Sequence, residues 1–284
     1  MLNRAYVEIG NLCNLSCSFC PGTRREGKQM TVSEFRTVAQ RLRPYTDYLY
    51  LHVMGEPLFH PELDAILPEA GALGFRVCIT TNGTLLDASS DLLLSHASVL
   101  HKVSISLHSM EGNGAESSLG EYLRSAADFA RRAAEKGIYT VFRLWNLDTA
   151  SRTGQNSENA SIEAFLHTEF PEEWTTRQNG FRLSRNVFLE YAGIFTWPTE
   201  SEAEAVDDGY CHGLMDQIAV LADGTVVPCC LDSEGEIALG NLFHAELSEI
   251  LASPRATRMC EGFRNHKMTE VLCKTCTYAR RFRK

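Results

Sequence analysis

The sequence has no long apolar run, no excess of positive charge and no secretion signal. No segment reaches the roughly 20 apolar residues of a membrane-spanning helix, so we expect no membrane partner. The formal net charge of −9 disfavours a general nucleic-acid binder, which needs a basic surface to neutralise phosphates. Residues 1–10 lack both the apolar core and the small-residue cleavage site of a signal peptide. Membrane, nucleic-acid and secreted classes are therefore disfavoured.

Cysteine, in contrast, is plentiful, with ten residues in the chain. Since nothing directs the chain to an oxidising compartment, disulfides are disfavoured, and the sequence predicts a cytoplasmic protein with reduced thiols. A chain of 284 residues with 44% apolar content can bury one large core and a small additional module. Ten thiols in such a protein direct attention to metal binding.

Three cysteines lie in one short segment, Cys13-Asn-Leu-Ser-Cys17-Ser-Phe-Cys20. Three thiolates in one loop can hold three irons of a [4Fe–4S] cubane, and thiolate is the ligand that this iron prefers. The fourth iron then has no protein ligand and can bind a small chelating molecule. A structural zinc site needs four ligands in two pairs, which an odd triplet fits poorly. The spacing therefore predicts a reactive cluster.

Strand and helix patterns alternate through the first part of the chain. A Thr-x-x-Glu capping box from Thr31 to Glu34 opens the first helix. Apolar or β-branched runs predict strands at 5–9, 48–54, 76–81, 102–107, 139–144 and 188–191, and helical patterns lie at 61–73, 87–94 and 121–136. This alternation predicts a parallel sheet with crossover helices, in which active sites form after the strands.

Polar or conformationally special residues follow these predicted strands. The second strand leads into Met54-Gly55-Glu56-Pro57, where glycine lets the backbone approach a ligand and proline fixes the turn. Ser104, Ser106 and His108 share one face of the fourth strand because they alternate along it. Such a polar stripe meets a ligand, solvent or its own neighbours, and a self-satisfied pair of hydroxyls is as consistent as a binding role.

The cysteine triplet, the Gly-Glu-Pro turn and the serine-bearing strand together resemble the radical SAM superfamily over residues 3 to about 195. The resemblance implies an α/β fold, a partial (β/α)6 TIM-like barrel followed by a small C-terminal module of a β-hairpin plus helix. The corresponding domains are residues 1–195 and 196–284. Cys13, Cys17 and Cys20 would hold the [4Fe–4S] cluster, and the amine and carboxylate of S-adenosylmethionine (SAM) would chelate its open iron.

The same resemblance implies residues that bind the cofactor. The Gly55-Glu56-Pro57 segment would line the site of the SAM amino group, because backbone at this position pairs with it in the family. Phe19 matches an aromatic residue near the adenine, and Ser106 matches a position that contacts the ribose or the methionine carboxylate. Arg143 is a further candidate for that carboxylate, or it pairs with an acid at the core edge. The family's usual adenine motif is not evident in Trp145-Asn146-Leu147.

A second group of cysteines, Cys211, Cys229, Cys273 and Cys276, lies toward the end of the chain. Residues 217–227 predict an apolar hairpin turning at 222–224, which brings Cys211 and Cys229 together. The pair Cys273 and Cys276 supplies two more thiolates after a helix near 247–251. On spacing alone, four thiolates in two groups fit zinc as well as iron and sulfur.

The surrounding pattern distinguishes these alternatives. The run Cys-x12-Gly-x4-Cys, then Leu239-Gly240-Asn241-Leu242 and a final C-x2-C, resembles the Twitch module, the short version of the SPASM domain. The resemblance implies one auxiliary [4Fe–4S] cluster fully ligated by protein. Cys230 is an alternative to Cys229 as ligand, and Cys260 is either a buried thiol or a hydrogen-atom donor.

The resemblance implies a radical SAM oxidoreductase. SAM would be reductively cleaved to methionine and a 5′-deoxyadenosyl radical that takes a hydrogen atom from the substrate, with a reducing flavodoxin or ferredoxin as partner. A fully ligated auxiliary cluster cannot bind substrate without losing a ligand, so we expect it to accept an electron in a net oxidation. Candidates for the base that takes the substrate proton are His52, His108, Arg143, Glu190 and Tyr191.

Two substrate classes and one non-enzyme alternative stay open. Twitch enzymes of this length resemble a dehydrogenase that oxidises an aminocyclitol alcohol, which favours a small polar substrate. Many SPASM relatives instead modify peptides or protein side chains, as RiPP maturases, epimerases and sulfatase maturases do. Such maturases often carry a leader-binding extension, which we do not expect in a chain that begins on its first strand. The polar segment 148–159 is consistent with a substrate lid or with a disordered loop. The non-enzyme alternative is a cluster-bearing electron carrier or a zinc-binding scaffold.

Overall fold

The computed structural model describes residues 1–110, 119–147, 157–193, 196–198 and 203–282. The chain divides into two compact units. The first unit comprises Met1–Cys13, Pro21–Arg76 and Phe195–Lys284, and the second comprises Asn14–Cys20 and Val77–Ile194. The assignment of residues 1–195 and 196–284 to separate domains stays a prediction.

The strands of the first unit follow the order β11-β10-β9-β1-β2. β1 (Arg4–Val7) pairs in parallel with both β2 (Tyr48–Tyr50) and β9 (Gln217–Val220). β10 (Thr225–Val227) runs antiparallel to β9 and to β11 (Gly240–Asn241). The predicted hairpin at 217–227 is therefore confirmed, and its first strand extends the sheet beside β1.

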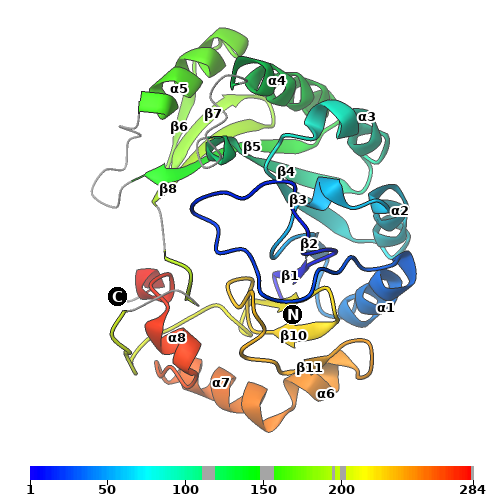
Figure 1. Ribbon diagram of the computed structural model, residues 1–284, viewed down its shortest axis with the longest axis vertical. Helices are drawn as coiled ribbons and strands as arrows, with labels where there is room; N and C mark the ends of the chain where they lie inside the picture. Colours follow the sequence, from blue (N-terminus) through cyan, green and yellow to red (C-terminus); the bar gives the residue numbers. More distant parts are fainter. Residues whose placement is uncertain (111–118, 148–156, 194–195, 199–202, 283–284) are drawn as a thin grey trace. The chain divides into compact units, whose positions relative to one another are not determined.

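Some helices of the first unit flank its strands, and the others follow its C-terminal hairpin in the chain (Figure 1). The N-cap of α1 is Thr31, whose side chain accepts from the backbone N–H of Glu34 while Glu34 caps the Thr31 N–H, so the predicted capping box is confirmed. The helices of this unit are α1 (Val32–Leu42), η1 (Pro57–Phe59), α2 (Leu63–Ala72), α6 (Leu247–Leu251), α7 (Pro254–Arg264), α8 (Val271–Thr275) and η6 (Ala279–Phe282).

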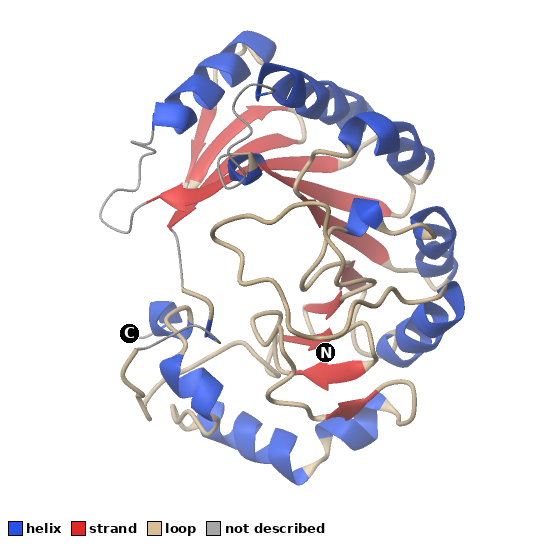
Figure 2. Cartoon of the chain, viewed as in Figure 1, coloured by secondary structure: helices blue, strands red, loops and turns tan. Residues whose placement is uncertain are grey.

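The strands of the second unit follow the order β3-β4-β5-β8-β7-β6, and α3, α4 and α5 cover one side of them (Figures 1 and 2). The neighbours from β3 to β8 are parallel, whereas β6, β7 and β8 pair antiparallel. The elements are β3 (Arg76–Thr81), α3 (Leu86–Ser95), β4 (Leu100–Ser106), η2 (Leu107–Ser109), α4 (Leu119–Glu135), β5 (Tyr139–Leu147), α5 (Ser157–Glu169), β6 (Thr175–Arg177), β7 (Gly180–Ser184) and β8 (Val187–Gly193).

Side chains on the strands of the second unit separate into two faces. Phe142 on β5 is fully buried and its ring packs 6.1 Å from that of Phe170, which follows α5. The next residue, Arg143, points to the opposite face because side chains alternate along a strand. That opposite face, away from the helices, carries the polar residues predicted to line the site.

Some elements differ from the sequence prediction. β2 ends at Tyr50 and not near residue 54, and the Met54 N–H donates to the Glu8 carboxylate instead of to a neighbouring strand. The hairpin of β6 and β7 and the helices α5, α7 and α8 are additions. Residues 148–156 of the predicted lid or loop lie outside the described residues, and α5 begins at Ser157.

Candidate functional site

Cys13, Cys17 and Cys20 lie in the loop between β1 and α1. Cys13 and Cys20 are exposed, Cys17 is half-buried, and all ten cysteines of the chain are thiols. The Cys20 N–H donates to the Cys17 carbonyl at 3.0 Å, which closes a turn between these two ligand candidates. Accessible thiols in one turn fit a cluster that must stay open to a small molecule.

The loop of Gly55 packs directly on the segment that leads into Cys13. Gly55 has a φ of +77°, and an added Cβ would lie 2.5 Å from the Gly10 carbonyl oxygen and 2.8 Å from that of Leu12. The Glu56 N–H donates to the same Leu12 carbonyl at 2.9 Å. The Glu56 side chain is buried and caps the Leu58 N–H, so it points into its own turn. Glycine is thus required here for close backbone contact, while Pro57 begins η1.

In the second unit, Asn14 of the cysteine loop binds the turn after β3. The Asn14 amide accepts from the Asn82 amide and donates to the Thr84 hydroxyl, both at 2.9 Å. The ring of Phe19 lies 4.9 Å from that of His108. Asn82 therefore holds the side chain of Asn14, which lies between Cys13 and Cys17.

Ser106, Arg143 and Glu190 form a row across neighbouring parallel strands. Ser106 on β4 is in register with Arg143 on β5, which is in register with Glu190 on β8. Residues in register point to the same face, about 4.8 Å apart from strand to strand. The Arg143 guanidinium also donates to the Thr80 hydroxyl at 3.3 Å and stacks 4.3 Å from the Trp145 ring. The predicted polar residues of these strands thus lie side by side.

The other base candidates occupy different surroundings. His108 is buried in η2, and its Nδ1 lies 3.1 Å from the Arg143 carbonyl oxygen and 3.4 Å from the Trp145 backbone nitrogen. Tyr191 follows Glu190 on β8 and so belongs to the opposite face, where burial and then a hydrogen bond with Glu163 raise its pKa. A phenol that stays protonated is a poor base. His52 lies on the first unit, where its ring packs edge-on against Tyr6.

A cavity of about 580 Å³ opens beside this row in the second unit. Glu190 lines it at the level of the row, while Lys102 and Tyr139 line it toward the starts of β4 and β5. The β6–β7 hairpin contributes Arg177, whose guanidinium lies 5.6 Å from the ring centre of Phe188. The lining therefore combines a carboxylate, two cations and aromatic rings, which suits a polar organic molecule.

The cysteines of the auxiliary group gather in the first unit. Burial, followed by the neighbouring thiols of Cys211, Cys230 and Cys273, raises the pKa of Cys229 well above its ordinary value. Burial, followed by Cys211 and Cys276, likewise raises the pKa of Cys273. Thiols that disfavour each other's ionisation lie close together, and a metal cluster would relieve this by binding thiolate. Cys211, Cys229, Cys273 and Cys276 thus fit an auxiliary cluster.

Backbone donors complete the auxiliary site. The Gly213 N–H lies 3.4 Å from the Cys211 sulfur, where it donates a hydrogen bond of the kind that tunes cluster potentials. In the described part of the chain, no three cysteine, histidine or carboxylate side chains converge closely enough to hold a single metal ion. A cubane accepts a wider set of thiolates, because each of them binds a different iron.

The Gly240-Asn241 pair of the sequence motif has a structural role. The Asn241 amide donates to the Asp223 carbonyl at 2.8 Å, and the Leu242 N–H donates to the Gly224 carbonyl at 2.8 Å. An added Cβ on Gly240 would lie 2.7 Å from the Ile250 side chain. The motif therefore locks the turn of the hairpin against α6.

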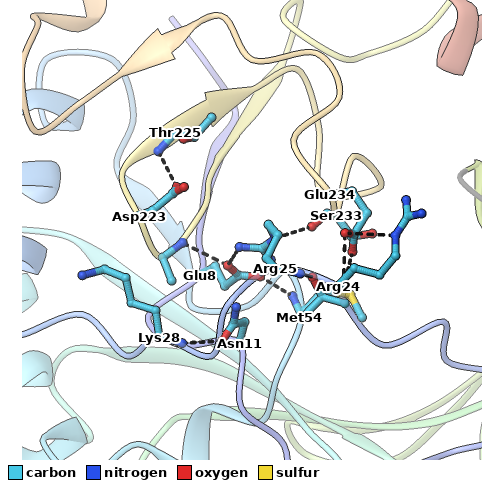
Figure 3. A network of polar contacts seen from close by, with 12 residues as sticks. Glu8, Asn11, Arg24, Arg25, Lys28, Met54, Asp223, Thr225, Ser233 and Glu234 are labelled. Atoms are coloured by element: carbon cyan, nitrogen blue, oxygen red, sulfur yellow. Dashed lines mark hydrogen bonds and ion pairs between the residues drawn. The ribbon is translucent and has the colours of Figure 1, made fainter.

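Two features near the cluster loops escaped the sequence analysis. Glu8, fully buried at the end of β1, binds Arg25 from the stretch that follows Cys20 (Figure 3). The sequence signal for this contact was a glutamate within an otherwise apolar predicted strand. The second feature is the contact between Tyr6 and Cys230: burial raises the pKa of Cys230 to about 11, and Tyr6 shares a hydrogen bond with it. That contact occupies Cys230 and favours Cys229 as the cluster ligand.

Comparisons with protein families and curated proteins give two domains. Residues 7–153 match the model described as the radical SAM superfamily, and residues 211–277 match SPASM, an iron–sulfur cluster-binding domain. A GTP 3′,8-cyclase of Chlorobaculum tepidum is 27% identical over 175 residues, 60% of this chain and 51% of that protein. A tungsten-containing aldehyde ferredoxin oxidoreductase cofactor-modifying protein of Pyrococcus furiosus is 32% identical over 28% of this chain and 24% of its own length. The chain thus spans about half or less of the length of these relatives.

Solved structures of similar fold cover nearly the whole chain. BtrN in complex with AdoMet and 2-DOIA superposes with a TM-score of 0.56 at 18% identity, over 98% of this chain and 93% of that one. SuiB of Streptococcus suis bound to the precursor peptide SuiA gives 0.60 at 13% identity, over 97% and 70%. Native anSMEcpe with AdoMet and the Cp18Cys peptide gives 0.61 at 14% identity, over 98% and 86%. These likenesses confirm the α/β partial-barrel fold.

No helix in the described ranges is long and apolar enough to cross a membrane. The radical SAM match extends over more than half of the 284 residues. The chain belongs to the radical SAM superfamily, with a SPASM domain, and its cofactors are SAM, the [4Fe–4S] cluster that binds it and an auxiliary iron–sulfur cluster.

Proposed function

We propose that the protein oxidises a small polar substrate, of the alcohol-dehydrogenation type, with its auxiliary cluster as electron acceptor. The observation that carries this proposal is the gathering of Cys211, Cys229, Cys273 and Cys276. A [4Fe–4S] cubane has four irons, and four thiolates would give each iron a protein ligand. A cluster so held has no place for substrate and can only exchange electrons.

The loop after β1 would hold the reactive cluster through Cys13, Cys17 and Cys20. SAM bound there supplies, on one-electron reduction, a 5′-deoxyadenosyl radical that takes a hydrogen atom from the substrate. The Gly55-Glu56-Pro57 segment lies against the start of this loop, which supports its role at the SAM amino group. Phe19 and Ser106 are proposed to contact the adenine side and the ribose or carboxylate, respectively.

Glu190 is proposed as the base. Its carboxylate lines the cavity, and Arg143 lies beside it in register. Arg143 keeps its positive charge at all relevant pH values, so it orients an oxygen of substrate or SAM rather than accepting a proton. His108 would hold the backbone of Arg143 and Trp145 through its Nδ1. His108 and Arg143 therefore support the reaction by orientation.

The proposed reaction balances in atoms and electrons. A reducing flavodoxin or ferredoxin would supply one electron, and bound SAM would yield methionine and 5′-deoxyadenosine. The substrate would give up one hydrogen atom to the deoxyadenosyl group and one proton to Glu190, and one electron would go to the cluster that Cys211, Cys229, Cys273 and Cys276 would hold. The net change in the substrate is the loss of two hydrogens, as in the oxidation of an alcohol to a ketone.

The cavity beside Glu190 supports the small-molecule class. Its volume of about 580 Å³ falls among those of small-ligand pockets. Lys102, Arg177 and Glu190 offer charged partners for hydroxyl, amine or acidic groups, and Tyr139 and Phe188 offer flat apolar surfaces. A compact polyhydroxylated or amino-substituted ring is the chemistry that this lining fits.

Peptide or protein side-chain modification is the second candidate. β6 is the last strand of its sheet, and Thr175, Thr176 and Arg177 are all exposed. An extended peptide can add to such an edge through main-chain hydrogen bonds. The neighbours SuiB and anSMEcpe were both solved with peptides bound.

A deuterium-transfer assay tests the proposal. The reduced, cluster-loaded protein is incubated with SAM and with carbon-deuterated candidates, one panel of cyclitols and one of peptides. We expect label in 5′-deoxyadenosine and a product lighter by two hydrogens with the cyclitol panel, and Glu190→Gln should lower the rate of product formation by about 10²-fold or more. Label transfer from peptides alone would contradict the small-molecule proposal and favour the second candidate.

A further inference from the structure

Glu8 is a carboxylate completely removed from solvent at the end of β1. Its neighbours in sequence, Val7 and Ile9, are core residues with at most 1% exposure. A buried carboxylate without partners is strongly unfavourable, so its charge must be matched by positive charge and by hydrogen-bond donors. The residues that supply these partners indicate what Glu8 does.

Both oxygens of Glu8 are fully used. Oε1 accepts from the Arg25 guanidinium at 2.7 Å and from the Met54 N–H at 3.0 Å. Oε2 accepts from the other arm of Arg25 at 2.8 Å and from the Ala222 N–H at 2.9 Å. Four donors match the four lone-pair sites of a carboxylate, and the Arg25 contact is the bidentate form that fixes orientation (Figure 3).

The donors come from segments that are far apart in the sequence. Arg25 follows the cysteine triplet, Met54 immediately precedes Gly55, and Ala222 lies at the turn between β9 and β10. Arg25 also donates through Nε to the Ser233 carbonyl at 2.8 Å, within the segment matched by the SPASM domain. One carboxylate thus joins the cysteine loop, the Gly55 loop and the auxiliary segment.

A second contact repeats this connection beside the first. The Arg24 N–H lies 3.2 Å from a Glu234 carboxylate oxygen, and Figure 3 shows both residues next to Arg25 and Ser233. At the other side of the loop, the Asn11 side chain accepts from the Lys28 N–H at 2.8 Å and donates to the Glu26 carbonyl at 2.9 Å. The stretch from Arg24 to Lys28 is therefore held along its length.

We propose that Glu8 and Arg25 are a positioning pair through which the auxiliary segment holds the SAM site in its binding conformation. This inference depends on the proposed SAM contact at Gly55. The Met54 N–H fixes the peptide just before Gly55, while Ala222 and Ser233 fix the other side of the same ion pair. Weakening the pair releases the Gly55 backbone and the loop after Cys20 together, although no cluster ligand is altered.

Substitution of Glu8 by glutamine preserves shape but not charge. The NH2 of the introduced amide would face donors from Arg25 and a backbone N–H, so two acceptor positions are lost at once. For Glu8→Gln we expect the Kd and KM for SAM to rise by about 10- to 100-fold while kcat changes little. The electron paramagnetic resonance signal of the reduced SAM cluster should then lose its shift on SAM addition at concentrations that saturate the wild type.

Arg25→Lys provides a variant that keeps the buried charge and hence the fold. Lysine cannot form the two-armed contact or reach the Ser233 carbonyl through a second donor, so we expect the same direction of change in SAM affinity. The matched control is Glu69→Gln, which breaks the two-armed contact of Glu69 with Arg36 between α1 and α2. That pair is partly exposed and contacts no cluster loop, so SAM affinity should stay at the wild-type value.

A measurement without cofactor separates this inference from the proposed function. Trypsin cleavage of the cluster-free protein after Arg24, residue 25 and Lys28 should be roughly tenfold faster in Glu8→Gln and Arg25→Lys than in wild type and Glu69→Gln. If the wild-type protein binds no SAM, the proposed function is wrong, but the slower trypsin cleavage of wild type than of the two variants is still expected. Unchanged SAM affinity and unchanged cleavage in both variants would overturn the positioning role.

Discussion

Gly55 offers the sharpest test of how the cysteine loop is built. Gly55→Ala must place a side chain at a φ of +77°, which costs about 1–2 kcal/mol for an L-residue. The new Cβ would also lie 2.5 Å from the Gly10 carbonyl oxygen and 2.8 Å from that of Leu12. Both oxygens belong to the backbone that leads into Cys13, so overpacking adds about 1–3 kcal/mol. We expect a total loss of about 2–5 kcal/mol in the free energy of unfolding.

Gly137→Ala is the matched control. Gly137 has a φ of +83° but nothing lies within 4 Å of an added Cβ, so only the conformational cost of about 1–2 kcal/mol applies. Denaturant unfolding of the cluster-free variants measures the difference, which isolates the clash with the two carbonyls. Loaded Gly55→Ala should also lose SAM binding, while Gly137→Ala keeps it. Equal destabilisation of both variants, with SAM binding retained in both, would show that the two carbonyls impose no such constraint.

Three further predictions follow from the auxiliary site, a buried histidine and a helix cap. Cys273→Ser should lower the iron content from about eight to about four per chain, while Cys260→Ser leaves it unchanged; a full complement of iron in Cys273→Ser would remove Cys273 from the ligand set. Burial lowers the pKa of His60, whose ring contacts the Met30 carbonyl and the Glu62 N–H. As the pH falls, the histidine of the unfolded chain is protonated before the buried ring of the folded protein is. The contribution of the neutral ring to the free energy of unfolding is therefore fully present above about pH 6.5 and is lost as the pH falls below that value. Unfolding titrations of wild type and His60→Gln from about pH 7.5 to 5.5 should show a smaller loss in the variant, and identical pH dependence would contradict the assignment. Thr31→Ala should lower the free energy of unfolding by about 1 kcal/mol, because α1 loses its N-cap. Denaturant unfolding measures this loss against Thr37→Ala within the same helix, and an equal or smaller loss in Thr31→Ala would contradict the prediction.

The elements that the sequence predicted well carry strong local signals. The capping box of Thr31 and Glu34 locates the start of α1 within one residue. Asp223 and Gly224 locate the hairpin of β9 and β10, since Gly224 has the positive φ of +84° that this turn requires. Both signals act over a few residues, and their outcome is independent of the rest of the fold.

Elements that depend on partners distant in the sequence were harder to predict. All three residues of β6 are exposed, so no alternation marks it, and it forms a strand only because β7 pairs with it and with β8. β2 is shorter than expected, and the Met54 N–H beyond its end donates to the carboxylate of Glu8, 46 positions away. Neither contact can be derived from residue spacing.

The candidate site shows the same division. Spacing alone predicted a cluster site at Cys13, Cys17 and Cys20, which lie within eight residues, whereas the second cysteine group was brought together by the predicted hairpin and by the resemblance to the Twitch module. The register that brings Ser106, Arg143 and Glu190 into one row follows from strand pairing, which the sequence does not specify. The partnership of Glu8 with Arg25 and Ala222 spans 17 and 214 positions, so only the fold reveals it.

The formation of 5′-deoxyadenosine decides whether the cluster held by the cysteine loop has an iron open to SAM. Reduced protein with a loaded cluster should convert SAM to 5′-deoxyadenosine and methionine, whereas Cys17→Ser should not. A wild-type protein that carries the cluster and forms no 5′-deoxyadenosine, or a Cys17→Ser variant that forms as much, would contradict the role of Cys13, Cys17 and Cys20 as the three ligands of a cluster with one open iron.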